Sequence, residues 1–303
     1  MRHVFEPALF HTTIGSHEPV LKVADGDTIE TWCVDAAGLD RHGESITPGG
    51  NPQTGPFYVE GARPDDTLEV RFDRLWPNRV RGFSGALVAP HTVEPAFAAA
   101  LPYDQDGRDY WTLDLERGTA TLDNPPAGLE TLPELPFEPM LGCFGVAPSC
   151  GQAISTATSG EHGGNMDYRG FREGVTVQLP VAAEGALLHV GDRHARQGDG
   201  EIVGTGIEVS FDVTVTVRVL SGKTIQWPRI DGDEYLMAVG NARPLDQAVQ
   251  HATTELMRML AEDCDLSYRA SSTLLGQCIE YDVGNVFDPA YTVVAKIARA
   301  LLP

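Results

Sequence analysis

The sequence predicts a mainly β protein in which a large β body precedes a smaller α/β part. Two observations support this. Up to about residue 225 the chain is a succession of short segments rich in valine, threonine and aromatic residues, bounded by glycine and proline clusters. Beyond Pro228, apolar residues recur at the three- and four-residue spacing of an amphipathic helix.

Four segments carry the clearest strand pattern. In 213–219, VTVTVRV, valine alternates with polar residues, as in a strand with one buried face. The other three are 67–72, 110–115 and 175–179. A shorter strand is expected at 57–60.

Two helices are predicted in the C-terminal part. Between Pro244 and Glu262, helical spacing is followed by Leu245, Val249, Ala252, Leu256, Met259 and Leu260. Proline suits the first turn of this helix. The second helix is expected from Leu266 to Ile279, with Asp265 as its N-cap. The last segment, 291–301, has a mixed pattern.

The composition argues against several function classes. The net charge of −21 disfavours nucleic acid as a partner, because phosphate binding requires a basic surface. No apolar run approaches the roughly 18 residues of a membrane span, and the N-terminal segment does not resemble a signal peptide. We therefore expect a cytoplasmic protein with no membrane partner. The five cysteines are scattered without a CxxC motif, so neither a disulfide framework nor a thiolate zinc site is expected.

The densest group of potential ligands lies in the segment GDRHARQGDGEIVGTGIE, residues 191–208. Residues two apart in a strand point to one face, so Asp192 and His194 could bind one ion or one substrate. Glu201 and Glu208 flank the glycine-rich VGTG and could return to the same cleft. A histidine with several carboxylates suits zinc or another divalent cation, whereas an all-oxygen subset suits calcium or magnesium.

A second candidate segment is GEHGGNMDYRG, residues 160–170. Asn165 and Asp167 have the same two-residue spacing and could face the same ion or substrate. His162 stands directly before the double glycine Gly163-Gly164 and is a further candidate.

Three neighbouring residues have simpler structural explanations. His189 lies in the apolar run ALLHV and is expected in the core. Asp199, in QGDGE, is typical of a turn. Arg193 should point away from Asp192 and His194 if the strand is regular, so we expect it at the surface.

Three blocks of the chain, in order and with matching spacing, resemble those of the acetamidase/formamidase family. NPQTGPFYVEGARPDDTLEV is similar to the family block NPxTGPxyVeGAepGDvL, and EHGGNMDYRGFREGVTVQLPV to its HGGNMD block. GALLHVGDRHARQGDGEIVGTGIEV matches GALfxxGDxHaxQGDGEvxGTaiE almost throughout. The resemblance covers nearly the whole chain, although Asp65-Asp66 replaces the usual Gly-Asp turn.

The resemblance implies a β-sandwich/barrel body with a smaller α/β C-terminal part, and hydrolysis of short aliphatic amides to carboxylate and ammonia. We expect an N-terminal β-sandwich portion at 1–140, a β-barrel portion carrying the GGNMD and GDRHARQGDGE motifs at 141–225, and an α/β portion at 226–303. Members of the family tend to be homo-oligomers, so a dimer or a higher assembly is expected.

The resemblance also implies a divalent metal ion among the acids and histidines of these blocks, with zinc preferred over calcium. Carried over by position, the expected metal ligands are Asp35, Asp167, Asp192 and His194. Asp35 is a candidate ligand only because it matches the family's TxD segment. The resemblance does not separate residues that bind the metal from those that bind the substrate.

The favoured hypothesis is a metal-dependent amidohydrolase. The ion would polarise the amide carbonyl and acidify water, and Glu208 or Glu201 would act as general base. Asn165 and the backbone N–H groups of the Gly163-Gly164 turn would hold the oxyanion. The expected substrate-binding residues are His162, Gly163 and Gly164.

Two alternatives stay open at this point. A covalent amidase would use a nucleophile such as Cys143 or Cys150. The better-known covalent routes require an active-site lysine, and the chain's three lysines stand in turn-like or terminal contexts. A non-catalytic small-ligand or metal-binding β-barrel protein would need the same ligands but no free base.

Overall fold

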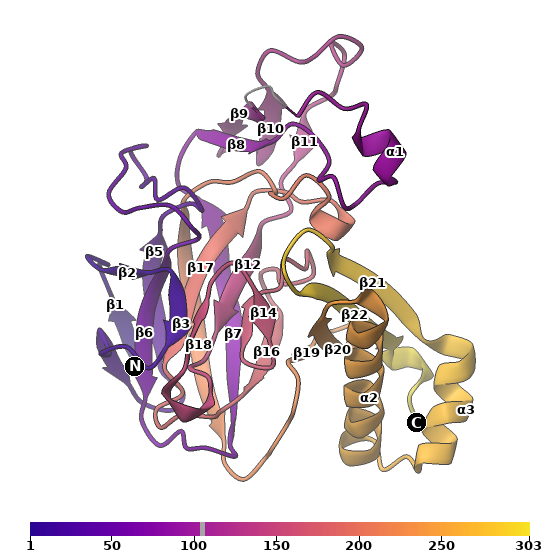
Figure 1. The fold of residues 1–303 in the computed structure, drawn as a ribbon. Helices are drawn as coiled ribbons and strands as arrows, with labels where there is room; N and C mark the ends of the chain where they lie inside the picture. Colours follow the sequence, from indigo (N-terminus) through magenta and orange to yellow (C-terminus); the bar gives the residue numbers. More distant parts are fainter. Residues whose placement is uncertain (104–106) are drawn as a thin grey trace.

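The computed structural model describes residues 1–103 and 107–303 of the chain. Within this part, a β body joins a C-terminal α/β part that carries the two long helices (Figure 1). The strands form sheets of nine, seven, four and two strands. The predicted mainly β fold with C-terminal helices is confirmed.

The nine-stranded sheet takes strands from both ends of the chain. Its order is β1 (Arg2–Val4), β5 (Thr28–Cys33), β18 (Phe211–Leu220), β7 (Thr67–Pro77), β16 (Thr176–Pro180), β19 (Arg229–Asp231), β20 (Tyr235–Ala242), β22 (Tyr291–Ala298) and β21 (Glu280–Asn285). Except for the parallel pair β1–β5, neighbouring strands are antiparallel. Strands from all three expected portions thus pair in one sheet, and the division at residues 140 and 225 stays a prediction.

The seven-stranded sheet brings the two candidate segments together. Its order is β14 (Ser159–Gly160), β15 (Gly163–Asn165), β12 (Met140–Gly145), β17 (Leu188–His194), β6 (Gln53–Val59) and β2 (Phe10–His11), and β4 (Leu21–Val23) also pairs with β6. β15 and β17 lie on opposite edges of β12. The GGNMD and GDRHARQGDGE segments are therefore neighbours across a single strand.

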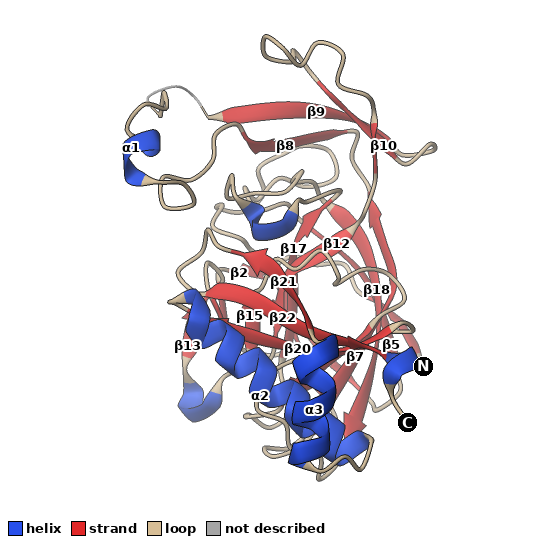
Figure 2. Cartoon of the chain, turned by 90° about the vertical axis from the view of Figure 1, so that its right-hand side faces the viewer, coloured by secondary structure: helices blue, strands red, loops and turns tan. Residues whose placement is uncertain are grey.

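The remaining strands form two small sheets. The four-stranded sheet, at the end of the molecule uppermost in Figure 2, contains β11 (Leu135–Pro136), β10 (Thr119–Leu122), β9 (Arg108–Asp114) and β8 (Arg81–Gly85). β13 (Ala153–Ser155) pairs with β3 (Thr13–Gly15). Short helical segments are α1 (Pro95–Ala98) and the 3₁₀ turns Ser149–Gly151, Asp199–Glu201 and Arg299–Leu301.

The two long helices, α2 (Leu245–Asp263) and α3 (Tyr268–Cys278), pack on one face of the C-terminal strands (Figure 2). Both lie within about two residues of their predicted bounds. The predicted N-cap of α3 is wrong: Ser267 caps the helix by accepting a hydrogen bond from Ala270 N at 3.2 Å. Asp265 has a φ of 52° in the connection between the helices, whereas an N-cap residue is extended.

The main core lies between the large sheets. Val213, Val215 and Val217 of β18 are fully buried in it, which confirms the alternation in the sequence. The four predicted strands correspond to parts of β7, β9, β16 and β18. In the part of the chain that the structure describes, no helix combines the length and apolar character that crossing a membrane would require.

Candidate active site

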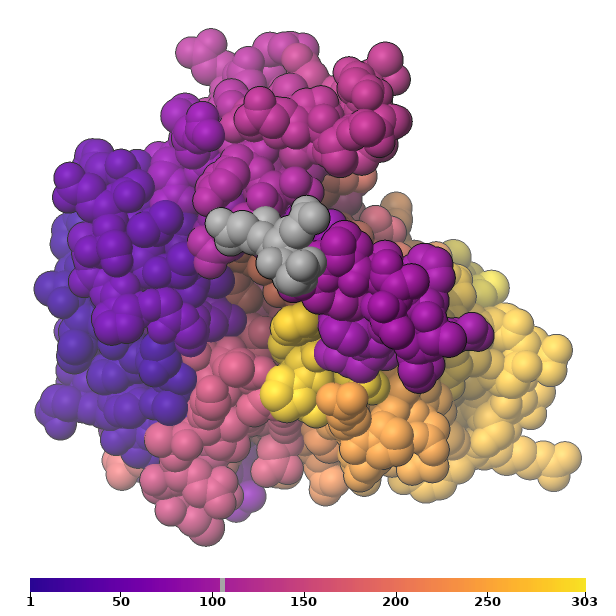
Figure 3. Space-filling view, turned by 45° about the horizontal axis from the view of Figure 1, so that its top comes forward, coloured from indigo at the N-terminus to yellow at the C-terminus, as the bar shows by residue number. Residues whose placement is uncertain are grey.

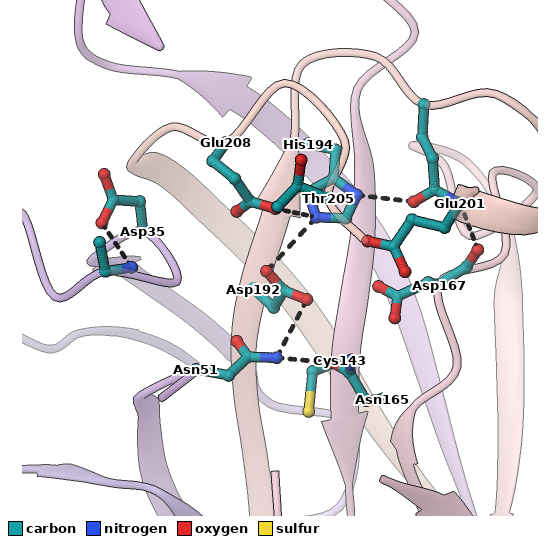
Figure 4. A network of polar contacts seen from close by, with 12 residues as sticks. Asp35, Asn51, Cys143, Asn165, Asp167, Asp192, His194, Glu201, Thr205 and Glu208 are labelled. Atoms are coloured by element: carbon teal, nitrogen blue, oxygen red, sulfur yellow. Dashed lines mark hydrogen bonds and ion pairs between the residues drawn. The ribbon is translucent and has the colours of Figure 1, made fainter. Parts of the chain in front are cut away.

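Three predicted residues converge at the end of β17. Asp192 and His194 are buried near its C-terminal end, and Glu208 reaches them through an isolated antiparallel bridge to His194. His194 Nε2 lies 2.7 Å from Glu208 Oε1 and 3.4 Å from Asp192 Oδ1 (Figure 4). The imidazole thus faces two carboxylates with the same nitrogen.

Gln197 fixes the orientation of His194. Its Nε2 donates to the backbone carbonyls of Asp167, at 2.5 Å, and Gly284, at 3.3 Å. Because carbonyls only accept, the Gln197 Oε1 atom must be the one that faces His194 Nδ1, at 2.7 Å. Nδ1 therefore carries the proton of the neutral ring, and the Nε2 lone pair points toward Glu208 and Asp192.

A second acidic group lies on the other side of the His194 ring, where Figure 4 shows Glu201 beside Asp167. Asp288, from the β21–β22 turn, completes it. The Asn285 Nδ2 atom lies 2.9 Å from Asp167 Oδ2, 3.0 Å from Glu201 Oε2 and 2.8 Å from Asp288 Oδ2. One amide group is thus shared by three carboxylates.

The two groups have His194 in common. Asp167, His194 and Glu201 offer ligand atoms within 4.8 Å of one another, and so do Asp192, His194 and Glu208. All five of these residues are buried, and so is Asp288. Among the ion pairs of residues 1–103 and 107–303, no lysine or arginine contacts any of these carboxylates.

Burial raises the pKa of four of the five acids, whereas at Asp192 the effect of burial is outweighed by contacts with His194, which lower its pKa. Burial raises the pKa of Glu208 to about 8 and that of Asp288 to about 7, because the charged forms lose their hydration. The pKa values of Asp167 and Glu201 are also raised well above their ordinary values by burial and by neighbouring carboxylates. Burial opposes a charge on His194, but the carboxylates of Glu208 and Asp192 raise its pKa well above the ordinary value, so in the protein alone bound protons neutralise part of this cluster.

The unpartnered atoms of the cluster match the needs of a divalent cation. Four buried atoms make no hydrogen bond within the described residues: Asp167 Oδ1, Asp192 Oδ1, Glu208 Oε2 and His194 Nε2. Carboxylate oxygens and an imidazole nitrogen are ligands of zinc, and a cation there would remove the cost of burying unpaired charge. The residues present fit a divalent metal.

Several residues of this cluster have unusual backbone conformations, and a glycine leaves space between two of its acids. Asn51, Asp167, Asp192 and Glu201 all have positive φ, of 64°, 42°, 48° and 48°, which is uncommon for residues other than glycine. Gly142 in β12 leaves the space between two of the acids, because a Cβ there would lie 2.3 Å from Asp167 Oδ1 and 2.8 Å from Asp192 Oδ2. Unusual backbone conformations of this kind cluster at functional sites.

Asn165 lies within the same network. Its Nδ2 donates to Asp288 Oδ2 at 2.6 Å, and its Oδ1 accepts from Asn51 Nδ2 at 2.6 Å. Asn51 Nδ2 also lies 3.1 Å from Asp192 Oδ2. The amides of Asn51 and Asn165 therefore connect the two acidic groups.

Asp35 is not brought into either group. Its Oδ2 accepts from Arg79 Nη2 at 2.5 Å, and its Oδ1 accepts from the backbone N–H groups of Ala37 and Leu39 at 3.0 and 2.9 Å. In Figure 4 it lies on the far side of Glu208 from His194. Since both oxygens already have partners, its contacts do not support the expected role as a metal ligand.

The expected Gly163-Gly164 turn is a strand. Both glycines belong to β15, which pairs with β12 on one side and β14 on the other, so the sheet occupies both backbone edges. His162 beside them is buried, and burial lowers its pKa to about 4. Its Nε2 atom makes no hydrogen bond within the described residues.

The prediction for Arg193 is wrong, because the residue is fully buried. The alternation rule assumes a regular strand, but Asp192 before it has left-handed φ, and both faces of β17 are covered. His189, by contrast, is fully buried as predicted, and its Nε2 lies 3.1 Å from Gly15 O.

Four residues of the network were not identified as candidates from the sequence. They are Asn51, Gln197, Asn285 and Asp288. Asn51 and Gln197 stand inside the blocks that carry the family resemblance, which was a usable signal. Asn285 and Asp288 lie in VGNVFDP, whose spacing matches no metal motif.

This chain is similar to known proteins in both sequence and fold. A family model described as the Acetamidase/Formamidase family matches residues 145–244. The crystal structure of an acetamidase from Yersinia enterocolitica superimposes with a TM-score of 0.85 and 30% identity, covering 100% of this chain and 93% of that one. This chain belongs to the acetamidase/formamidase family. The crystal structure of a recombinant predicted acetamidase/formamidase from Thermoanaerobacter tengcongensis gives a TM-score of 0.83 at 27% identity, covering 99% of this chain and 97% of that one.

One curated relative of this acetamidase/formamidase family member is a putative formamidase of Schizosaccharomyces pombe, 23% identical over 253 residues. That match covers 65% of this chain and 60% of the relative, so it spans less than two thirds of the relative's length. The residues matched by the family model include Asn165, Asp167, Asp192, His194, Glu201 and Glu208. Asn51, Asn285 and Asp288 lie outside it.

On the face shown in Figure 3, the segment around α1 of this family member lies against the β21–β22 turn, drawn in yellow. His91 Nε2 lies 2.9 Å from Phe287 O in that turn, and Ala89 N donates to Ile202 O at 2.7 Å. Because the turn also carries Asp288, these contacts lie one residue away from the acidic cluster.

Proposed function

We propose that this protein is an amidohydrolase that cleaves a short-chain aliphatic amide, of the formamide or acetamide type, to a carboxylate and ammonia with a divalent metal ion. The observation that carries the proposal is the convergence of His194 Nε2 with the carboxylates of Asp192 and Glu208, without a lysine or arginine partner among the described residues. Family membership and the names of the relatives give the reaction class.

We assign the metal to Asp167, Asp192 and His194, and prefer zinc over calcium. A histidine nitrogen with carboxylates is typical of zinc, whereas calcium prefers six to eight oxygens. The hydrogen bond from His194 Nδ1 to Gln197 supports this assignment, since such a partner orients a metal-binding imidazole. Asp35 is left out because Arg79 holds its carboxylate.

A divalent ion bound here would polarise the amide carbonyl and lower the pKa of a water molecule to about 7. Glu208 is the proposed general base, because its Oε2 atom has no hydrogen-bond partner within the described residues and can take up a proton. The same atom would then pass the proton to the leaving nitrogen. Glu201 is the second candidate, although its Oε2 already accepts from Asn285.

Asn165 and His162 are the proposed contacts to the substrate. The Asn165 amide lies in the acidic cluster, and its Nδ2 is a donor that the carbonyl oxygen could share with Asp288. The buried, neutral imidazole of His162 offers a further polar atom. Both edges of β15 are paired with other strands. Gly163 and Gly164 would therefore act by leaving space for the substrate rather than by donating hydrogen bonds to it.

Ammonia release from a panel of formamide, acetamide and longer linear amides, with and without a chelator, tests the proposal. We expect turnover of at least one short amide and its loss on chelation. Binding of metal without turnover of any amide would favour the alternative, a non-catalytic small-ligand or metal-binding protein. A dimer or higher homo-oligomer stays a prediction, which sedimentation can test.

The covalent alternative finds little support at the cysteines. Burial and the nearby Asp192 raise the pKa of Cys143 well above that of a free thiol, so it stays protonated. Its Sγ lies 3.8 Å from Thr156 O, which is not a base. Cys150 is exposed in the 3₁₀ turn Ser149–Gly151, outside the network of the acidic cluster.

A further inference from the structure

Tyr168 follows Asp167 directly in the chain and is almost fully buried. Its hydroxyl donates to Asp282 Oδ2 at 2.7 Å. The T-shaped contact with Phe171, with ring centroids 5.5 Å apart, fixes the ring from the other side. Tyr168, the residue after the proposed metal ligand Asp167, is therefore hydrogen-bonded to β21.

Asp282 is also paired with Lys296 of β22. Lys296 Nζ lies 2.7 Å from the same Oδ2 atom of Asp282, and 5.1 Å from the centre of the Tyr235 ring. We call Tyr168, Asp282 and Lys296 the anchoring triad. Only 17% of the Lys296 side chain is exposed, so this charge is better shielded from solvent than that of a surface ion pair.

The anchoring triad forms part of the wall of a cleft of about 750 Å³ where the C-terminal part meets the β body. Trp76, Phe137 and Tyr235 also line this cleft. The triad thus lies on the opposite side of the 167–168 segment from the acidic cluster.

β21 connects the triad to the acidic cluster. Asp282 and Asn285 are three residues apart, which in a regular strand would place them on opposite faces. The register of β21 against β22 shifts between Val283 and Asn285. Asp282 meets Tyr168 and Asn285 reaches Asp167, so β21 supplies a partner to each of these two neighbouring residues.

The 166–168 segment and β21 also touch between these two points. A Cβ on Gly284 would lie 3.1 Å from Met166 O and 3.2 Å from Tyr168 Cβ, so glycine permits the close approach. Asp167 itself has a φ of 42°, a conformation that its surroundings must enforce. Gln197 links the same two segments, because its Nε2 donates to the carbonyls of both Asp167 and Gly284.

We propose that the anchoring triad positions Asp167 for metal binding and Asn285 for its hydrogen bond to Asp167, so that Tyr168, Asp282 and Lys296 are positioning residues of the acidic cluster. The inference rests on the proposed metal-dependent function. It also assigns a role to Lys296, one of only three lysines in the chain.

Calorimetric titration of the metal-free protein with Zn²⁺ alone tests this proposed role of the triad. Tyr168→Phe removes only the hydroxyl, and Lys296→Met removes the ammonium group with its charge and its hydrogen bond to Asp282. We expect each to weaken zinc binding about 10-fold or more, as loss of an outer partner of a metal ligand typically does. The double variant should be no weaker than the worse single one, because both act through Asp282.

Two matched controls are available. Tyr281→Phe removes an exposed hydroxyl that bonds to Thr253, and Lys223→Met breaks an exposed ion pair with Asp263. Both should bind zinc like the wild type. Thermal melting of each metal-free variant separates a general loss of stability from a specific loss of affinity.

Wild-type affinity in both Tyr168→Phe and Lys296→Met would overturn this inference and leave the proposed function intact. Equal weakening in the controls would also overturn it. Failure of the wild-type protein to bind zinc would instead overturn the zinc assignment, and with it this role of the triad.

Discussion

His194 Nε2 lies 2.7 Å from Glu208 Oε1, although Gln197 places the proton of the neutral imidazole on Nδ1. Two acceptor atoms thus face each other in a buried site. Either a proton or a nearby cation would remove the repulsion, and Asp192, on the same side of the ring, is one of the ligands proposed for that cation. The proposed metal-dependent reaction depends on this relationship.

Replacing Glu208 by glutamine keeps the shape of the side chain but removes the proposed base. We expect Glu208→Gln to retain metal and to lose about 10²- to 10⁴-fold in turnover, the usual contribution of general base catalysis. Metal content and ammonia release, measured on the same preparation, check both parts. Glu134→Gln, at an exposed ion pair with Arg117, is the control. Loss of the metal together with turnover would show that Glu208 is a ligand instead.

Replacing Gly142 by alanine should disturb the site without touching its chemistry. The new Cβ would lie 2.3 Å from Asp167 Oδ1 and 2.8 Å from Asp192 Oδ2, so one of these carboxylates must move. We expect Gly142→Ala to weaken metal binding about 10-fold or more. Gly198→Ala, where a Cβ meets nothing within 4 Å, should bind metal normally. Equal affinities in the two variants would argue against a cation between Asp167 and Asp192.

His162 should make the protein less stable in acid. Burial lowers its folded-state pKa to about 4, while the unfolded chain has the ordinary value of about 6.5. Between these two pH values the unfolded state binds more protons, so the free energy of unfolding falls as the pH falls, by up to about 3 kcal/mol. Above about pH 6.5 this contribution does not change.

The difference between wild type and His162→Gln isolates this contribution. Urea denaturation at several pH values between 4 and 7.5 should show a shallower decline in the variant. His42→Gln, at an exposed position, should follow the wild-type profile. A variant profile parallel to the wild type throughout would contradict the assignment of a buried neutral imidazole.

Much of the fold and part of the site could be predicted from local patterns. The valine alternation of β18 and the helical spacing of α2 survive in the structure because each reflects one buried face. The blocks containing Asp167, Asp192 and Glu208 were identified as candidate segments, and pairing across β12 and the His194–Glu208 bridge bring these acids together.

The expectations for Asp35 and Arg193, and the failure to identify Asp288, went astray for reasons of long-range contacts or backbone conformation. Arg79, 44 residues away in the chain, pairs with Asp35, which no local pattern reveals. Arg193 is buried because Asp192 departs from strand geometry. Asp288 reaches the cluster only because the C-terminal strands continue the nine-stranded sheet of the body.

The most direct test measures ammonia released from formamide and acetamide by one preparation in three states: as purified, after chelation and dialysis, and after addition of Zn²⁺. The account predicts turnover that is lost in the metal-free protein and restored by the ion. Full activity in a preparation verified to be metal-free would contradict it.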